Sequence, residues 1–104
     1  MAVIEVDDVN LIGQDFVGPV VRSGPLAEAV IDAVADDNPD SDILVVDRGD
    51  YVRIHTARTC RLTRASLQRH LGASFELAAL EIEMPSFKGR LRTRVHEYVW
   101  SYDK

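Results

Sequence analysis

The stretch from Val17 to Asn38 constrains the fold most, because prolines mark its strand, its turn and its end. Its first residues are rich in β-branched valine, which favours a strand, and Pro19 predicts that this strand lies at a sheet edge or starts there. Gly24-Pro25 predicts a helix start, since proline fits the first helical position, where a backbone N–H has no partner. Pro39 disfavours helical geometry at Asn38, so the helix is expected to end there.

The residues that follow predict a two-stranded antiparallel hairpin. Inside the first helix, apolar residues from Leu26 to Val34 recur at spacings of three and four, which is typical of a buried helical stripe. Residues 43–46 form a short apolar run between turn residues, and residues 51–55 alternate between apolar and polar side chains. We expect Val52 and Ile54 to face the core, and Tyr51, Arg53 and His55 to face the opposite side.

The second half predicts a helix followed by strands. Thr63 is a good N-cap for a helix over Arg64 to Leu71, and Gly72 suits its C-terminal end. Residues 80–84 alternate as a strand does, after a helical turn over 76–79, and two further strands are expected over 88–95 and 97–102. The order β-α-β-β-α-β-β predicts an α+β fold, with a mainly antiparallel sheet and two or three helices packed on one face.

Two segments are expected along the chain. We expect residues 1–15 to form a flexible N-terminal arm, because chain termini are often poorly ordered. Residues 3–6 also fit a short edge strand. Residues 16–104 predict a single domain, which is large enough to bury a core without a metal or a disulfide. The one cysteine, Cys60, and the acidic start of the chain favour a cytoplasmic protein. No apolar run reaches the ~18–20 residues that a membrane-spanning helix needs.

Charge is distributed unevenly. The net charge is −5, but residues 1–47 hold eleven acids against one arginine, whereas residues 48–104 hold six acids against eleven lysines and arginines. The asymmetry predicts either distinct electrostatic faces that orient a macromolecular partner or, if the fold interleaves the two halves, no such contrast.

Catalytic and metal-binding patterns are missing from the sequence. Oxygen-bearing residues alternate from Asp36 to Asp47, but Pro39 interrupts this run and Ser41 stands where a calcium loop needs glycine. The histidines and Cys60 lack the spacing of metal ligands, and no nucleophile elbow or phosphate-binding glycine loop is present. We therefore expect no catalytic residue, metal or cofactor in this chain.

Two strand patterns near the C-terminus have a structural and a functional interpretation. Lys88, Arg90, Arg92 and Arg94 alternate, so they are expected on one strand face, either paired with Glu81 and Glu83 or forming a docking stripe for an acidic surface. Nucleic acid is a weaker partner for the stripe, since the sequence pI is about 5.0. The second pattern is aromatic, and core packing is its favoured interpretation. It comprises Tyr98, Trp100 and Tyr102.

Several short motifs together resemble a known family. They are VGPVVR at 17–22, ADDNP at 35–39, VDR at 46–48, YVRI at 51–54, LG at 71–72 and LE at 80–81. Their order and spacing resemble the small effector, coupling or regulatory protein of soluble bacterial multicomponent di-iron monooxygenases. The turn MPSF at 84–87 and the short arm resemble the branch with toluene, alkene and isoprene monooxygenases. Ala73 departs from the basic residue that relatives often carry there.

The resemblance implies a non-catalytic effector without a cofactor, which binds the di-iron hydroxylase oligomer and couples electron transfer and oxygen activation to hydrocarbon oxidation. It also implies a system with a ferredoxin and an NADH-dependent reductase, an effector that is monomeric when free, and no nucleic-acid or membrane partner. The contact residues expected from the matched motifs and from the basic ladder are Arg22, Ser23, Asp36, Asp37, Asn38, Arg48, Tyr51, Lys88 and Arg90.

Structural roles remain open for some of these residues, since Arg48 with Asp47 can shape the hairpin and Asn38 can cap the helix. Two other functions also remain open. A small-molecule-binding regulatory domain of ferredoxin-like shape would share the element order and would form a homodimer. A nucleic-acid-binding module would use the basic ladder and would bind with steep salt dependence.

Overall fold

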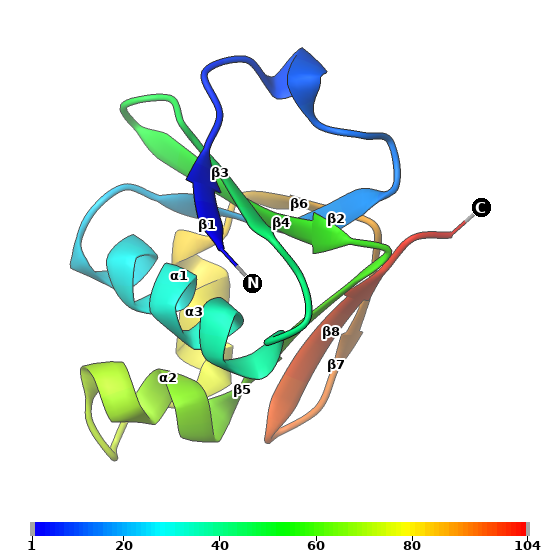
Figure 1. The fold of residues 1–104 in the computed structure, drawn as a ribbon. Coiled ribbons are helices and arrows are strands. Elements are labelled where there is room, and N and C mark those ends of the chain that lie inside the picture. Colours follow the sequence, from blue (N-terminus) through cyan, green and yellow to red (C-terminus); the bar gives the residue numbers. More distant parts are fainter. Residues whose placement is uncertain (1, 104) are drawn as a thin grey trace.

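Two β-sheets and three α-helices enclose one core in the computed structural model, which describes residues 2–103 (Figure 1). The five-stranded sheet has the order β1-β3-β4-β2-β6. Its strands are β1 (Val3–Glu5), β2 (Phe16–Arg22), β3 (Ile43–Asp47), β4 (Tyr51–Ala57) and β6 (Ser86–Lys88). The three-stranded sheet has the order β5-β8-β7. Its strands are β5 (Thr59–Thr63), β7 (Arg90–Thr93) and β8 (Glu97–Ser101).

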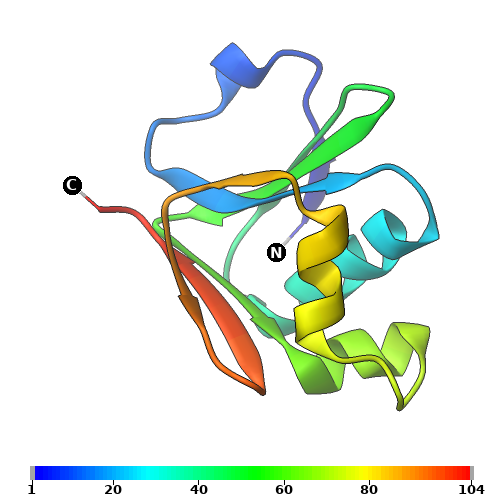
Figure 2. The same cartoon turned by 180° about the vertical axis from the view of Figure 1, so that it is seen from behind.

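The helices are α1 (Pro25–Asp37), α2 (Arg64–Leu71) and α3 (Leu77–Glu83), and a short 3-10 helix spans Val9–Leu11. The helices lie on one side of the five-stranded sheet, and residues 6–15 arch over its opposite side (Figures 1 and 2). Only β1 and β3 pair in parallel among the described strands; the other pairs are antiparallel. The predicted α+β class with a mainly antiparallel arrangement is confirmed, but the strands form two sheets rather than one.

Local signals place the first two helices correctly. α1 begins at Pro25 and ends at Asp37, and the backbone N–H of Asn38 donates to the carbonyl of Val34. α2 spans the predicted residues, and the Thr63 hydroxyl accepts a hydrogen bond from the Ser66 N–H at 3.1 Å, as an N-cap does.

The predicted hairpin is confirmed as β3 and β4. The short edge strand predicted near the N-terminus is confirmed as β1, which pairs with β3. The flexibility of the arm over residues 1–15 stays a prediction, and Met1 and Lys104 lie outside the described residues.

The edge position predicted for β2 from Pro19 is wrong, because β2 has β4 on one side and β6 on the other. The pairing of β2 with β4 stops at Val17, opposite Thr56, and resumes at Val20, opposite Arg53. Pro19 lies in this gap and faces Phe87 of the three-residue strand β6. The missing N–H of proline therefore removes no bond from the ladder with β4.

The strand predicted over residues 80–84 is also wrong, because these residues belong to α3 and its C-terminal end. Leu77, Leu80 and Met84 are buried and follow one another at spacings of three and four, as on one face of a helix. Ile82, which a strand would have turned inward with Leu80, is 78% exposed. A five-residue alternating pattern fits both periods, and packing decides between them.

The single strand predicted over residues 88–95 is wrong as well, because Gly89 separates β6 from β7. Gly89 has φ of 105°, and a Cβ there would lie 2.8 Å from both the Ser101 carbonyl oxygen and a Val17 methyl group. The chain crosses from one sheet to the other at this point. Lys88 therefore pairs with Gly18 in the larger sheet, whereas Arg90 and Arg92 pair with β8, so the basic ladder does not share one strand face.

Side chains from both sheets and the helices form the core. Trp100 and Tyr98 are buried on β8 and Tyr102 packs against the core, so the core interpretation of the aromatic pattern is confirmed. β5 was not predicted, although the alternation of its buried residues Cys60 and Leu62 is a sequence signal for it.

Gly89→Ala is expected to lower the free energy of unfolding by about 2–4 kcal/mol, since it adds a clash to an unfavourable φ. Gly49→Ala is the matched control, because Gly49 has φ of 90° but a Cβ there meets no atom within 4 Å. The control is expected to lose about 1 kcal/mol, for the backbone alone. Urea unfolding measures both, and equal losses would contradict the close contact between the sheets.

Candidate functional site

Four of the predicted contact residues meet where β2 ends beside the turn between β3 and β4. Arg22 lies opposite Tyr51 in the ladder, and its guanidinium carbon is 5.7 Å from the centre of the Tyr51 ring. The Ser23 hydroxyl donates to the Gly49 carbonyl at 2.7 Å, which ties β2 to the turn. We call Arg22, Ser23, Arg48, Tyr51 and Arg53 the hairpin site.

A hollow of about 380 Å³ lies at the hairpin site, on the side of the five-stranded sheet that faces away from the helices. Strand alternation explains its position. Val21 and Val52 pair toward the core, so the neighbouring pairs Val20–Arg53 and Arg22–Tyr51 point to the other side. The residues that line the hollow are Val20, Arg48, Tyr51, Arg53, Pro85 and Ser86.

The hollow is electropositive. Arg22 lies 3.7 Å from Glu83, but the guanidinium groups of Arg48 and Arg53 form no ion pair with any described side chain. Arg53 is half-buried, whereas Arg48 is exposed. Arg53 is not among the contact residues expected from the sequence, although its alternation with Tyr51 predicts that both lie on the same strand face.

Asp37 and Asn38 lie away from the hairpin site, at the end of α1 that meets β5 and α2. The Asp37 carboxylate accepts from the Thr63 N–H at 2.7 Å, and from the hydroxyls of Thr63 and Ser66 at 3.0 and 2.5 Å. The Asn38 side chain donates to the carbonyls of Val34 and Arg61 and accepts from the Arg61 N–H. Both side chains therefore hold α1 to the rest of the fold.

The other predicted contacts are separated from the hairpin site or already paired. Asp36 lies 2.9 Å from His70, and this hydrogen bond, with the nearby Arg69 guanidinium, lowers the pKa of the Asp36 carboxyl. Arg90 donates to Asp103 at 2.7 Å on the three-stranded sheet. Lys88 is half-buried on β6, across from Gly18.

His55 is buried on the same side of the sheet as Arg53, with 1% exposure. Neither ring nitrogen has a hydrogen-bond partner among the described residues. Burial, and then the charges of Arg53 and Lys88, lower the pKa of His55 to about 4, against a weaker opposing effect of the Gly18 backbone. The ring is therefore neutral at physiological pH.

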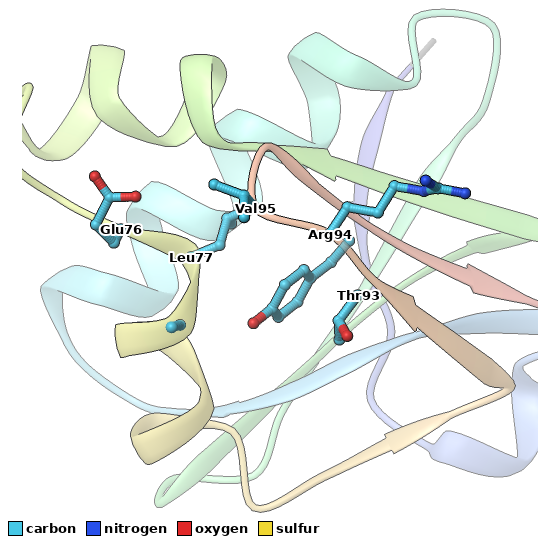
Figure 3. A pocket seen from close by; sticks show the side chains of 7 residues that line it. Glu76, Leu77, Thr93, Arg94 and Val95 are labelled. Atoms are coloured by element: carbon cyan, nitrogen blue, oxygen red, sulfur yellow. The ribbon is translucent and has the colours of Figure 1, made fainter.

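A second hollow, of about 360 Å³, lies between α3 and the turn that joins β7 to β8 (Figure 3). Leu77, Val95 and the Tyr98 ring supply apolar surface, and Glu76 and Arg94 stand on opposite rims (Figure 3). Val95 is 73% exposed. The Tyr98 hydroxyl donates to Glu81, and burial with this carboxylate raises the pKa of Tyr98 to about 12. None of the predicted contact residues lines this groove.

No three His, Cys, Asp or Glu side chains within residues 2–103 are grouped so that they could hold a metal ion. Burial raises the pKa of the Cys60 thiol to about 12, so the thiol stays protonated. No helix in this range is long and apolar enough to cross a bilayer.

Comparison with known proteins identifies relatives over nearly the whole chain. Residues 15–101 match the model of the MmoB/DmpM family. The chain is 58% identical over 97 residues, which are 93% of each chain, to the effector subunit of the alkene monooxygenase system of Xanthobacter autotrophicus strain ATCC BAA-1158 / Py2.

Two solved structures share the fold. A chain of a phenol hydroxylase–regulatory protein complex superposes with a TM-score of 0.72 at 18% identity, over 85% of this chain and 99% of that chain. The soluble methane monooxygenase regulatory protein B superposes with a TM-score of 0.63 at 18% identity, over 86% of this chain and 66% of that chain.

Asp37→Asn is expected to lower the free energy of unfolding by about 2–3 kcal/mol, because it removes the charged acceptor of three hydrogen bonds and turns an amide toward their donors. The control is Asp40→Asn in the exposed turn after α1, expected to change stability by less than about 0.5 kcal/mol. Urea unfolding of both variants measures the difference. An Asp37→Asn variant as stable as the control would contradict the role of Asp37 in holding α1 to Thr63 and Ser66.

Acid is expected to destabilise the protein through His55. Its pKa of about 4 in the folded state lies below the ordinary histidine value of 6.5, so the unfolded chain binds the proton first. Stability is therefore full above pH 6.5 and falls as the pH drops to about 4, by about 3 kcal/mol. His55→Phe should lack this component, which is measured as the difference between the unfolding free energies of wild type and variant from pH 4 to 7. Parallel pH profiles would contradict a neutral buried His55.

Proposed function

The chain belongs to the MmoB/DmpM family and is an effector protein of a multicomponent monooxygenase, and we propose that it docks on the di-iron hydroxylase of that system through the hairpin site. The observation that carries the function is the 58% identity to an alkene monooxygenase effector subunit, over 93% of both chains. By the same similarity, the hydroxylase oxidises an alkene or a related small hydrocarbon.

The effector contributes no reacting group to this chemistry in our proposal. It couples electron transfer and oxygen activation to substrate oxidation by binding one state of the hydroxylase more tightly than another, since a ligand shifts an equilibrium only by its difference in affinity. The rest of the proposed system is a ferredoxin and an NADH-dependent reductase, and the free effector is a cytoplasmic monomer.

The hairpin site is suited to an anchoring role. Arginine and tyrosine are enriched among the residues that carry most of the binding energy at interfaces, and here they surround a hollow. A standard interface buries about 800 Å² on each partner, roughly an eighth of the 5990 Å² surface of this protein.

The groove between α3 and the β7–β8 turn is the second candidate contact, favoured by the exposure of Val95 at its rim. The groove and the hairpin site share no residue, so single substitutions can show which of the two surfaces contacts the hydroxylase. Arg22 and Arg94 are both exposed arginines, and each belongs to only one of the two surfaces.

The function is tested by titrating the hydroxylase of the system, with its ferredoxin and reductase, with this protein. The rate of substrate oxidation and the product formed per NADH are expected to rise and to saturate near one effector per active site. Arg22→Ala should raise the effector concentration needed for half-maximal rate by about 10-fold, a cost within the usual range for an anchor residue.

Arg94→Ala is the matched control and is expected to behave as wild type. If Arg94→Ala weakens stimulation and Arg22→Ala does not, the groove replaces the hairpin site as the contact. No stimulation by the wild-type chain, with a hydroxylase that responds to a known effector, would contradict the proposed function itself.

A further inference from the structure

We propose that the hollow at the hairpin site binds an acidic side chain of the hydroxylase, with its carboxylate between the guanidinium groups of Arg48 and Arg53. The inference rests on the proposed function and adds the chemistry of the contact. It starts from the two arginines that line one hollow without an acidic partner among the described residues.

Five other arginines of the chain have a carboxylate partner, which contrasts with this pair. Arg92 and Arg94 also form no ion pair among the described residues, but neither lines this hollow. Arg58, Arg61, Arg64, Arg69 and Arg90 each lie within 2.7–3.6 Å of a carboxylate oxygen of this chain. The acids nearest in sequence to the hairpin site, Asp47 and Asp50, do not line the hollow. The Asp47 carboxylate instead accepts from the Gly49 N–H at 2.9 Å within the turn. A carboxylate is thus the group that the hollow lacks.

The hollow has room for an acidic side chain, and its lining suits one. At about 380 Å³ it lies near the lower limit of ligand pockets, which are about 300–1,000 Å³. Val20 is 7% exposed, and with Pro85 and the Tyr51 ring it gives an apolar lining on which a short aliphatic stem can pack. A charge pair that is shielded from water by such surface is stronger than an exposed one.

The surroundings keep the hollow positive. Arg22 lies over the Tyr51 ring as a third cation. Unlike Arg48 and Arg53, Arg22 has an acidic partner, Glu83, at 3.7 Å. The charges of Arg53 and Lys88 act on buried His55 from the same side of the sheet. Arginine binds carboxylates in a planar, two-pronged geometry, which fixes orientation as well as supplying attraction.

A protein carboxylate fits better than a polyanion. The chain carries a net charge of −5, which repels nucleic acid at a distance, and Arg90, Arg92 and Arg94 do not extend the hollow into a continuous basic strip. An acidic side chain on an otherwise mixed protein surface avoids this repulsion.

Charge reversal tests the proposal. Arg48→Glu is expected to weaken the affinity for the hydroxylase about 30-fold at 50 mM NaCl, since it replaces an attractive charge with one that repels the partner's carboxylate. Arg48→Lys keeps the charge but not the two-pronged geometry, and is expected to lose affinity less than Arg48→Glu does. Arg92→Glu on exposed β7 makes the same change of charge away from the hollow and should stay within about 3-fold of wild type, as surface charges do. Binding is measured by titration calorimetry, after circular dichroism has shown that each variant is folded.

Two results would overturn the proposal while leaving the proposed function standing. The first is wild-type affinity and stimulation in Arg48→Glu. The second is an equal loss in Arg48→Glu and Arg92→Glu, which would assign the effect to the overall charge. If the wild-type chain neither binds nor stimulates the hydroxylase, the proposed function fails first.

A probe of the free protein separates a carboxylate site from a general anion site. Hexaglutamate, hexaglutamine and a hexanucleotide are titrated in turn into the ¹⁵N-labelled protein. Amide signals of Tyr51 and Ser86 are expected to shift with hexaglutamate and not with hexaglutamine. Equal or larger shifts with the hexanucleotide would contradict the selectivity for protein carboxylates.

Discussion

The contact between the two sheets at Gly89 fixes where the hairpin site can form. With no Cβ at this residue, the backbone turns away from β6 against Val17 and the Ser101 carbonyl, and the chain enters the second sheet. β6 is thereby held beside β2, which brings Pro85 and Ser86 to the hollow that Val20, Tyr51 and Arg53 form on the neighbouring strands. Away from the hairpin site, the Asp37 carboxylate holds the C-terminal end of α1 to Thr63 and Ser66.

The outer face of the five-stranded sheet, which is the face opposite the helices, carries the hairpin site and with it the proposed function. A sheet in a small α+β protein needs one buried face for stability, and here the helices and the three-stranded sheet cover it together. The opposite face carries Arg22, Tyr51 and Arg53, and His55 is buried on it. Residues 6–15 pass over this face of the sheet (Figure 1). Unpaired arginines on such a face contribute little to folding, whereas a partner that brings a carboxylate gains from them. In our proposal, the positive charge that acts on the partner is gathered at the hairpin site and does not extend over a whole half of the molecule.

The sequence predicts those parts of the fold that depend on neighbours along the chain. Pro25, Thr63 and Gly72 act on the backbone next to them, so the bounds of α1 and α2 follow from these residues. α3 and the break at Gly89 depend on packing against distant residues, which no local pattern contains. The residues of the hairpin site came from the family resemblance, and strand alternation alone placed Arg53 beside Tyr51. The structural roles of Asp37 and Asn38 involve partners 23 to 29 positions away, so the sequence offered no way to separate them from surface contacts.

Hydrogen–deuterium exchange of this protein, with and without the hydroxylase, tests whether the outer face of the five-stranded sheet docks on the hydroxylase. We expect slower exchange on binding in the β3–β4 turn, residues 47–50, and in the edge strand β6 with the residues before it, residues 85–88. We expect unchanged exchange in the β7–β8 turn, residues 94–96. Protection of residues 94–96 and of α3, with none at residues 47–50, would contradict docking through the outer face of the five-stranded sheet.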